Sequence, residues 1–144
     1  MSTKYPKTPH LPFSPCVNID DTTLDEKHCR LFLEEDIIIT EKLDGGNCQI
    51  YQGKVYARTN STEATHSSFS AVKQLSSPDN YALFGENMFG IHSIEYTKLT
   101  DYFYLFSILD VKTKTFISWD EVKSFSENNG LETPPILFEG KFKE

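Results

Sequence analysis

Alternating hydrophobic and polar residues along the chain predict a set of short β-strands. The β-branched run at 37–40 is typical of a buried strand. Two alternating segments, 47–52 and 54–59, are separated by Gly53 and predict a β-hairpin. Residues 4–15 contain four of the seven prolines and predict an extended lead-in without regular structure. Further strands are expected at 81–86, 102–111 and 115–117.

Two segments have helical rather than alternating spacing. A short helix is expected at 67–76, with its apolar residues on one side. A second helix begins at Ser118, because Ser118 and Glu121 have the spacing of a capping box. It directs Val122 and Phe125 inward and ends at the glycine after two asparagines. Together the elements predict an α+β fold of twisted, mainly antiparallel sheets with peripheral helices.

Composition narrows the class of protein. A chain of 144 residues with 38% hydrophobic and 13% aromatic residues predicts one compact domain, 1–144, with a β-rich interior. No apolar run is long enough to span a bilayer and no signal-peptide core is present, so no membrane role is expected. Three cysteines without metal-ligand spacing predict reduced thiols in the cytoplasm. The net charge of −7 predicts weak non-specific affinity for nucleic acid.

The segment 41–47, Glu-Lys-Leu-Asp-Gly-Gly-Asn, carries the most informative chemistry. It places Lys42 at the end of a strand, between Glu41 and Asp44 and before a glycine pair that lets backbone approach a ligand. This arrangement suits an amine that attacks phosphorus. A surface turn is the alternative interpretation, since Asp-Gly is a common hairpin signal. No P-loop pattern occurs, so a Walker-type phosphate site is not expected.

Four motifs in a fixed order resemble those of a known superfamily. They are Lys42-x-Asp44-Gly45, Arg58, Gly85-Glu86-Asn87 and the apolar segment 103–108. The set resembles the covalent nucleotidyltransferases, which comprise ATP-dependent RNA and DNA ligases and mRNA capping enzymes. Within it the chain looks most like the RNA ligase family, and segments 4–12 and 85–93 resemble a bacterial and phage branch. The resemblance extends from Lys4 to about Glu139.

This resemblance implies a nucleotidyltransferase (ligase adenylation) domain that uses ATP with Mg²⁺ or Mn²⁺. A lysine would attack the α-phosphate to form lysyl-AMP, and AMP would pass to the 5′-phosphate end of RNA, or of DNA. ATP phosphates would hold the metal ion with few protein oxygens, so no metal site built from protein residues is expected. The reaction needs a neutral amine, whereas an unperturbed lysine has a pKa of ~10.4. Partial burial and a nearby cation are expected to favour the neutral form.

Residues around the lysine take roles from the same resemblance. Lys42 would be the adenylated nucleophile. Asn47 would lie near the AMP phosphate. Glu41, with its backbone at the base, and Asp44 and Gly45 would complete this side of the nucleotide site.

Three residues further along the chain would bind the rest of the nucleotide. Arg58 would contact sugar or phosphate, and its alternative is a solvated strand charge. Glu86 would accept a hydrogen bond from a ribose hydroxyl, and its alternative is a surface acid. Phe106 is preferred to Phe103 as the platform for adenine, because the two face opposite ways unless a bulge intervenes. Core packing is the alternative for either ring.

Two further family motifs are expected beyond this chain, so the domain is interpreted as C-terminally truncated. They would supply a metal-binding glutamate and lysines for the α-phosphate. The segment 139–143 imitates both, but a similar segment lies in a linker of related sequences, so Glu139 and Lys141 are unassigned. Losing one such phosphate donor costs ~3–4 kcal/mol, or roughly a 100- to 1,000-fold slower step.

Two alternatives to a self-sufficient enzyme therefore stay open. One is a non-catalytic nucleotide- or RNA-end-binding module. The other is one half of a split ligase, which would need a complementary subunit or would self-associate through open sheet edges. A small structural domain whose motifs match by chance is a third interpretation, which the ordered set disfavours.

Overall fold

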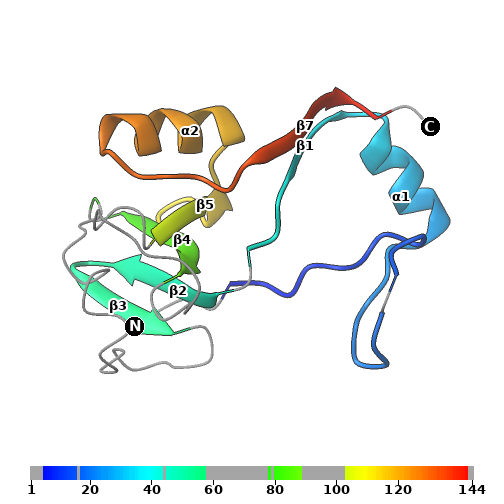
Figure 1. Cartoon of the computed structure of the whole chain (residues 1–144), viewed down its shortest axis with the longest axis horizontal. Coiled ribbons are helices and arrows are strands. Elements are labelled where there is room, and N and C mark those ends of the chain that lie inside the picture. The colour runs from blue at the N-terminus through cyan, green and yellow to red at the C-terminus, as the bar shows by residue number, and fades with distance from the viewer. Residues whose placement is uncertain are drawn as a thin grey trace. The chain divides into compact units, whose positions relative to one another are not determined.

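The computed structural model describes residues 5–15, 17–43, 45–57, 78, 80–88 and 103–142. Two compact units divide the chain, and each is described by itself (Figure 1). Unit 1 comprises Met1–Tyr5 and Lys42–Pro135, and unit 2 comprises Pro6–Glu41 and Ile136–Glu144. Both contain antiparallel strands and a helix, so the predicted α+β class is confirmed.

Unit 1 is built on a five-stranded antiparallel sheet with the order β3-β2-β4-β5-β6. The strands are β2 (Gly46–Tyr51), β3 (Lys54–Ala57), β4 (Tyr81–Asn87), β5 (Phe103–Asp110) and β6 (Thr115–Phe116). Gln52 and Gly53 join β2 to β3 with φ angles of 51° and 74°, as in a type I′ turn. The strands predicted from alternation are confirmed in this part of the chain.

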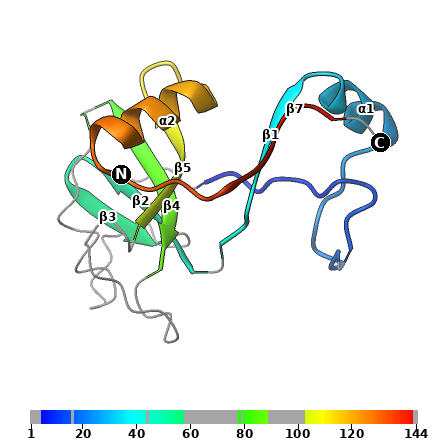
Figure 2. The same ribbon diagram turned by 45° about the horizontal axis from the view of Figure 1, so that its top comes forward.

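Helix α2 (Trp119–Asn128) packs on one face of this sheet, beside β5 (Figure 2). Ser118 Oγ accepts the Glu121 N–H at 3.2 Å, so the predicted helix start is confirmed. The Glu121 carboxylate accepts from the Ser118 hydroxyl at 3.3 Å, which completes a local pair at the cap. At the other end the Leu131 N–H donates to Ser126 O at 2.8 Å around Gly130, a Schellman-type ending.

The sheet face beneath α2, here called the helix face, holds the main core. Val122 and Leu131 are buried there with seven strand residues: Cys48, Ile50, Val55, Leu83, Phe103, Leu105 and Ile108. The predicted inward positions of Val122 and Phe125 are confirmed, since Phe125 packs against the same cluster. Side chains on neighbouring strand positions alternate between faces. Every second side chain of β2 and β4 therefore points to the helix face.

The other side of the sheet, here called the opposite face, has a smaller aromatic cluster. Ala82, Phe84 and Leu109 are buried there and pack with Tyr5, Tyr51, Phe106 and Val111. The Tyr5 ring lies with its centroid 5.2 Å from those of both Phe84 and Phe106. Burial raises the pKa of the Tyr5 phenol, and a hydrogen bond with Ser107 partly offsets this. The first residue described is thus packed onto the sheet.

Strand β5 contains a β-bulge at Phe106, which shifts the alternation of its side chains between the two faces. Phe84 pairs with Ser107 while Gly85 pairs with Leu105, so Phe106 is the extra residue. Phe103 and Leu105 lie on the helix face before the bulge, and Ile108 returns to that face after it. Phe106 packs on the opposite face.

Unit 2 contains α1 (Glu26–Leu33) and a two-stranded antiparallel sheet of β1 (Asp36–Thr40) and β7 (Ile136–Lys141). Figure 1 shows β1 and β7 side by side, with α1 preceding β1. The strand predicted at 37–40 is confirmed as β1. Neither α1 nor β7 was predicted. Cys29 is the buried residue of α1, and Ile37 is the buried residue of β1.

The proline-rich lead-in has no regular structure in its described residues, as predicted, and His10 anchors it within unit 2. The His10 N–H donates to Thr22 O at 2.8 Å, and the Leu24 N–H donates to His10 O at 2.8 Å. The His10 ring lies 3.3 Å from the Asp21 carboxylate. The helix predicted at 67–76 lies outside the described residues. No described helix is long and apolar enough to cross a bilayer.

Candidate functional site

The clearest feature of the candidate site is a pair of polar residues on adjacent strands. Asn47 of β2 is the register partner of Glu86 of β4, so the two share one face of the sheet. Cys48 and Ile50 point to the helix face, which puts Asn47 and Glu86 on the opposite face. Directly opposed side chains have Cβ atoms about 4.5–5.5 Å apart. Two residues implied as nucleotide contacts, 39 positions apart in the sequence, are therefore neighbours.

Glu86 also holds the segment that carries the lysine. The Gly45 N–H donates to Glu86 Oε1 at 3.2 Å. A Cβ atom added at Gly45 would lie 2.5 Å from Asn87 O and 2.7 Å from Met88 Sδ, so only glycine fits this backbone path. The close approach in the structure is to the end of β4, and the predicted approach of this backbone to a ligand stays a prediction.

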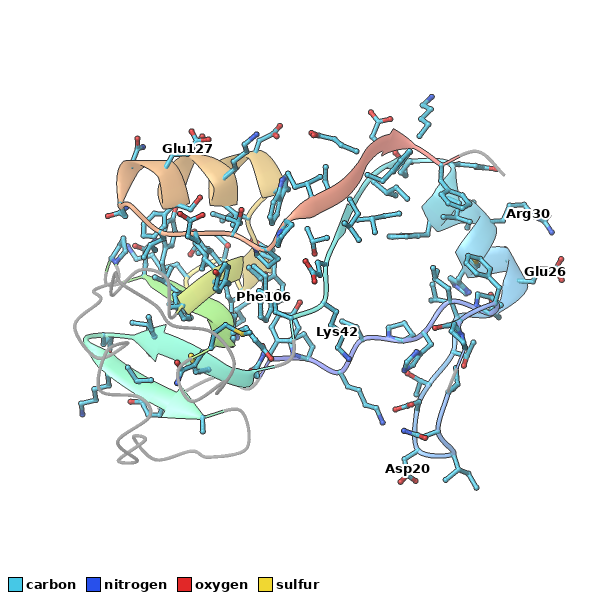
Figure 3. All side chains as sticks on the ribbon, viewed as in Figure 1. Asp20, Glu26, Arg30, Lys42, Phe106 and Glu127 are labelled. Carbon is cyan, nitrogen blue, oxygen red and sulfur yellow. The ribbon has the colours of Figure 1, made fainter. Side chains whose placement is uncertain are left out.

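Lys42 lies on the irregular connection between β1 and β2 (Figure 3). Its side chain is exposed, so the expected partial burial is wrong. In this connection Leu43 and Gly45 are the residues turned partly inward, while Glu41 and Lys42 are exposed. Glu41 is the last residue of unit 2 before Lys42 begins unit 1, and the role of its backbone at the base stays a prediction.

The structure separates the two candidate aromatic residues. Phe103 is fully buried on the helix face, where its ring would lie 2.5 Å from a Cβ added at Gly85. Phe103 is therefore a core residue, and Gly85 is small because this ring packs on it. Phe106 is only half-buried and lies on the face of Asn47 and Glu86. The sheet brings Asn47, Glu86 and Phe106 to one face.

Asp44 and Arg58 lie outside the described residues, so their roles stay predictions. Among the residues that the structure describes, no group of three or more His, Cys, Asp or Glu side chains could hold a metal ion.

Sequence reasoning missed Gln49 and Tyr5 at this site. Gln49 lies two residues after Asn47 on the same strand and therefore on the same face. The alternation along β2 was the signal that could have identified it. Tyr5 contacts Phe106 through its packing, which local sequence does not reveal.

A buried thiol lies behind the site. Cys48 is fully buried on the helix face, between Asn47 and Gln49. Burial raises the pKa of the Cys48 thiol far above its ordinary value, and the negative charge of Glu86 raises it further. Cys48 is therefore a packing residue and not a nucleophile.

Comparison with known proteins adds a family and a fold. Residues 35–144 match the family model for RNA ligase. No curated protein sequence matches the chain. Among solved structures, Naegleria gruberi RNA ligase with PPi has a TM-score of 0.60 and 20% identity, covering 100% of this chain and 49% of that chain.

Two mutants of the same ligase are similarly related. An apo form has a TM-score of 0.62 and 18% identity, covering 82% of this chain and 40% of that chain. A form with ATP and Mn has a TM-score of 0.54 and 20% identity, covering 77% of this chain and 38% of that chain. Identities this low show a likeness of fold alone. The chain spans less than half the length of each of these ligase structures.

Proposed function

Because the chain belongs to the RNA ligase family, we propose that it is an ATP-dependent adenylyltransferase that forms lysyl-AMP at Lys42 for the joining of RNA ends. The observation that carries this proposal is the shared face of Asn47, Glu86 and Phe106, with Gly45 tied to Glu86. This face holds two polar side chains and one aromatic ring, and the segment that carries the lysine is tied to it. A nucleotide has phosphate and ribose groups that suit the polar side chains and a base that suits the ring.

Each residue has a role that its chemistry allows. The Asn47 amide donates to the α-phosphate, and the Phe106 ring stacks against adenine. An ionised carboxylate accepts several hydrogen bonds, so Glu86 can hold the Gly45 N–H and also accept from a ribose hydroxyl. Arg58 and Asp44 are proposed to complete the phosphate side.

In the proposed step the lone pair of the Lys42 amine attacks the α-phosphorus of ATP. A P–N bond forms, and the bond from the α-phosphorus to the bridging oxygen breaks. Pyrophosphate leaves with that electron pair, and the amine releases a proton to solvent. The AMP would then pass to a 5′-phosphate end of RNA or DNA.

A divalent cation is proposed to accompany the nucleotide. A mutant of Naegleria gruberi RNA ligase was solved with ATP and Mn, which supports a divalent cation in this role. When bound, the ion would neutralise phosphate charge and favour the uncharged amine of an exposed lysine.

Incubation with α-³²P-labelled ATP and Mg²⁺ or Mn²⁺ tests the proposal. We expect label that survives denaturation in neutral detergent and is released by pyrophosphate. Lys42→Ala should abolish labelling, whereas Lys112→Ala, at an exposed lysine in the β5–β6 turn, should retain it. Equal labelling of both variants would rule out Lys42 as the nucleophile.

A second candidate function is a nucleotide- or RNA-end-binding half of a two-chain ligase. The exposure of Lys42 favours it. So do the outer edges of β1 and β7, which pair with no other strand in the part of the chain that the structure describes. Nucleotide binding without retained label would support this candidate over the first.

A further inference from the structure

Gln49 is a polar side chain in an apolar place. It lies in the middle of β2, is only 4% exposed, and has buried Tyr56 and Phe84 as its register partners on either side. Within the described residues, its Nε2 atom is completely buried and makes no hydrogen bond. An unpaired buried donor destabilises a fold, and an aliphatic side chain would fit these neighbours better. Packing with Tyr56 and Phe84 therefore does not explain why this position carries an amide.

The position of Gln49 relates it to the nucleotide contacts. Asn47, Glu86 and Tyr104 form one row of register partners across the sheet, while Gln49, Phe84 and Ser107 form the next row of the same face. These rows are about 7 Å apart along the strands. Phe106 is the bulge residue between Leu105 and Ser107, so the aromatic platform lies between the two rows.

The spacing assigns different parts of a nucleotide to the two rows. The row of Glu86 faces ribose and phosphate in the proposed function. The separation of the rows roughly matches the reach from a ribose hydroxyl to the outer edge of a purine. Gln49 lies on β2 and Phe106 on β5, with β4 between them, so a base that stacks on the β2 side of Phe106 would direct its edge across β4 toward Gln49.

We propose that the Gln49 carboxamide recognises the N6/N7 edge of adenine and makes the site select ATP over GTP. This inference rests on the proposed nucleotide-binding function. A carboxamide fits that edge, because its N–H donates to N7 while its oxygen accepts from the N6 amine. Guanine has an oxygen acceptor in place of the amine, so one of the two hydrogen bonds is lost. Glutamine has three side-chain torsions, which let the shielded amide turn toward the base on binding.

Calorimetric titration of the full chain with ATP, GTP and 7-deaza-ATP tests the inference. 7-Deaza-ATP has no N7 acceptor, so we expect the wild type to bind it about 10-fold or more weakly than ATP, the size of one lost base contact. GTP should be disfavoured to a similar degree. Gln49→Leu should bind ATP and 7-deaza-ATP equally and should be at least as stable as the wild type, because the unpaired amide is gone.

Trp119→Phe is the matched control. Trp119 Nε1 is a second buried donor without a partner in the described residues, and Trp119 packs on the helix face. Its replacement removes an unpaired donor away from the site, so the preference for ATP should stay unchanged. Gln49→Glu keeps the shape of the side chain and loses the donor, so it should also lose discrimination against 7-deaza-ATP.

The outcomes separate this inference from the function on which it rests. A wild type that binds ATP and 7-deaza-ATP equally, or a Gln49→Leu variant that keeps the wild-type preference, overturns the role of Gln49 and leaves nucleotide binding intact. A wild type that binds no nucleotide overturns the proposed function itself, and the inference with it.

Discussion

Two adjacent glycines in the lysine segment differ sharply in the space around them. A Cβ at Gly45 would lie 2.5 Å from Asn87 O, whereas at Gly46 the nearest atom, also Asn87 O, would be 3.8 Å away. The first distance is a clash with backbone, and the second is an ordinary contact. These residues form a natural pair of test and control for how tightly the segment is packed against β4.

Gly45→Ala is expected to lower the free energy of unfolding by about 1–3 kcal/mol, the usual cost of overpacking. The same change should reduce labelling by ATP, because the segment that carries Lys42 must move away from Glu86. Gly46→Ala should change both quantities little. Urea denaturation and the labelling assay measure the two effects. Equal losses in both variants would contradict the packing seen at Gly45.

Cys48 is expected to resist alkylation in the folded protein. Burial first, and the charge of Glu86 second, raise the pKa of its thiol, so the reactive thiolate is absent at neutral pH. Iodoacetamide treatment at pH 8 followed by peptide mass mapping should find Cys48 unmodified until urea is added. Because burial is the larger cause, Glu86→Gln should leave this protection in place. Rapid native modification would show that the sheet opens at β2.

At the scale of elements, α1 depends on a charged N-cap. Asp25 accepts the His28 N–H at 2.7 Å, and the His28 ring lies against the same carboxylate. The backbone hydrogen bond is the largest cause that lowers the pKa of Asp25, followed by the hydrogen bond from the ring. A carboxyl whose pKa is lower in the folded state stabilises that state above its unfolded pKa, and the contribution is lost as pH falls through the folded value.

The stability difference between wild type and Asp25→Ala should therefore be largest near neutral pH and shrink below about pH 4, the range of an unfolded aspartate. Asp25→Asn keeps an acceptor at the cap and loses the charge, so it should retain part of the neutral-pH stability with a weaker pH dependence. Denaturant midpoints followed by circular dichroism from pH 7 to pH 3 give the comparison. A stability difference between wild type and Asp25→Ala that grows as the pH falls would contradict the role of Asp25 as a charged N-cap.

The elements also show which parts of the fold could be predicted from sequence. The hairpin of β2 and β3 and the start of α2 were predicted because turn and capping residues act locally. Helix α1 was missed because Leu31 and Phe32 are exposed and blur its apolar stripe, although Asp25 was an available signal. Strand β7 was missed because its register partner β1 lies about 100 residues earlier, as with Asp36 and Lys141.

The same distinction holds for the candidate site. Motif order pointed to Asn47, Glu86 and Phe106 separately, and pairing across β2 and β4 shows two of them as neighbours. The exposure of Lys42 and the unpaired Nε2 atom of Gln49 depend on packing around the strands. No single stretch of sequence records that packing.

At the scale of the whole molecule, the net negative charge disfavours contacts with many phosphates of a nucleic acid. The chain carries 21 acidic residues against 14 lysines and arginines. In the proposed function, the 5′-phosphate end of an RNA would therefore be held through few phosphates. Its binding should depend only weakly on salt concentration. Each phosphate contact on a single strand contributes about −0.7 to the slope of log K against log salt.

We expect a slope no steeper than about −2 for a 5′-phosphorylated RNA oligonucleotide, which corresponds to two or three contacts. Fluorescence anisotropy across a range of KCl concentrations measures it. Removal of the 5′-phosphate should weaken binding more than shortening the oligonucleotide does. A slope steeper than about −4 would indicate an extended basic surface that the composition does not suggest.

The extra residue in β5 has a consequence for how such a protein can evolve. Because the extra residue at Phe106 shifts the alternation, Phe103 and Ile108 pack in the core on the helix face. Phe106 lies on the opposite face of the same short strand. Changes that retune ligand preference can therefore accumulate at one set of positions without loosening the other. An eight-residue strand can in this way be selected for stability and for specificity independently.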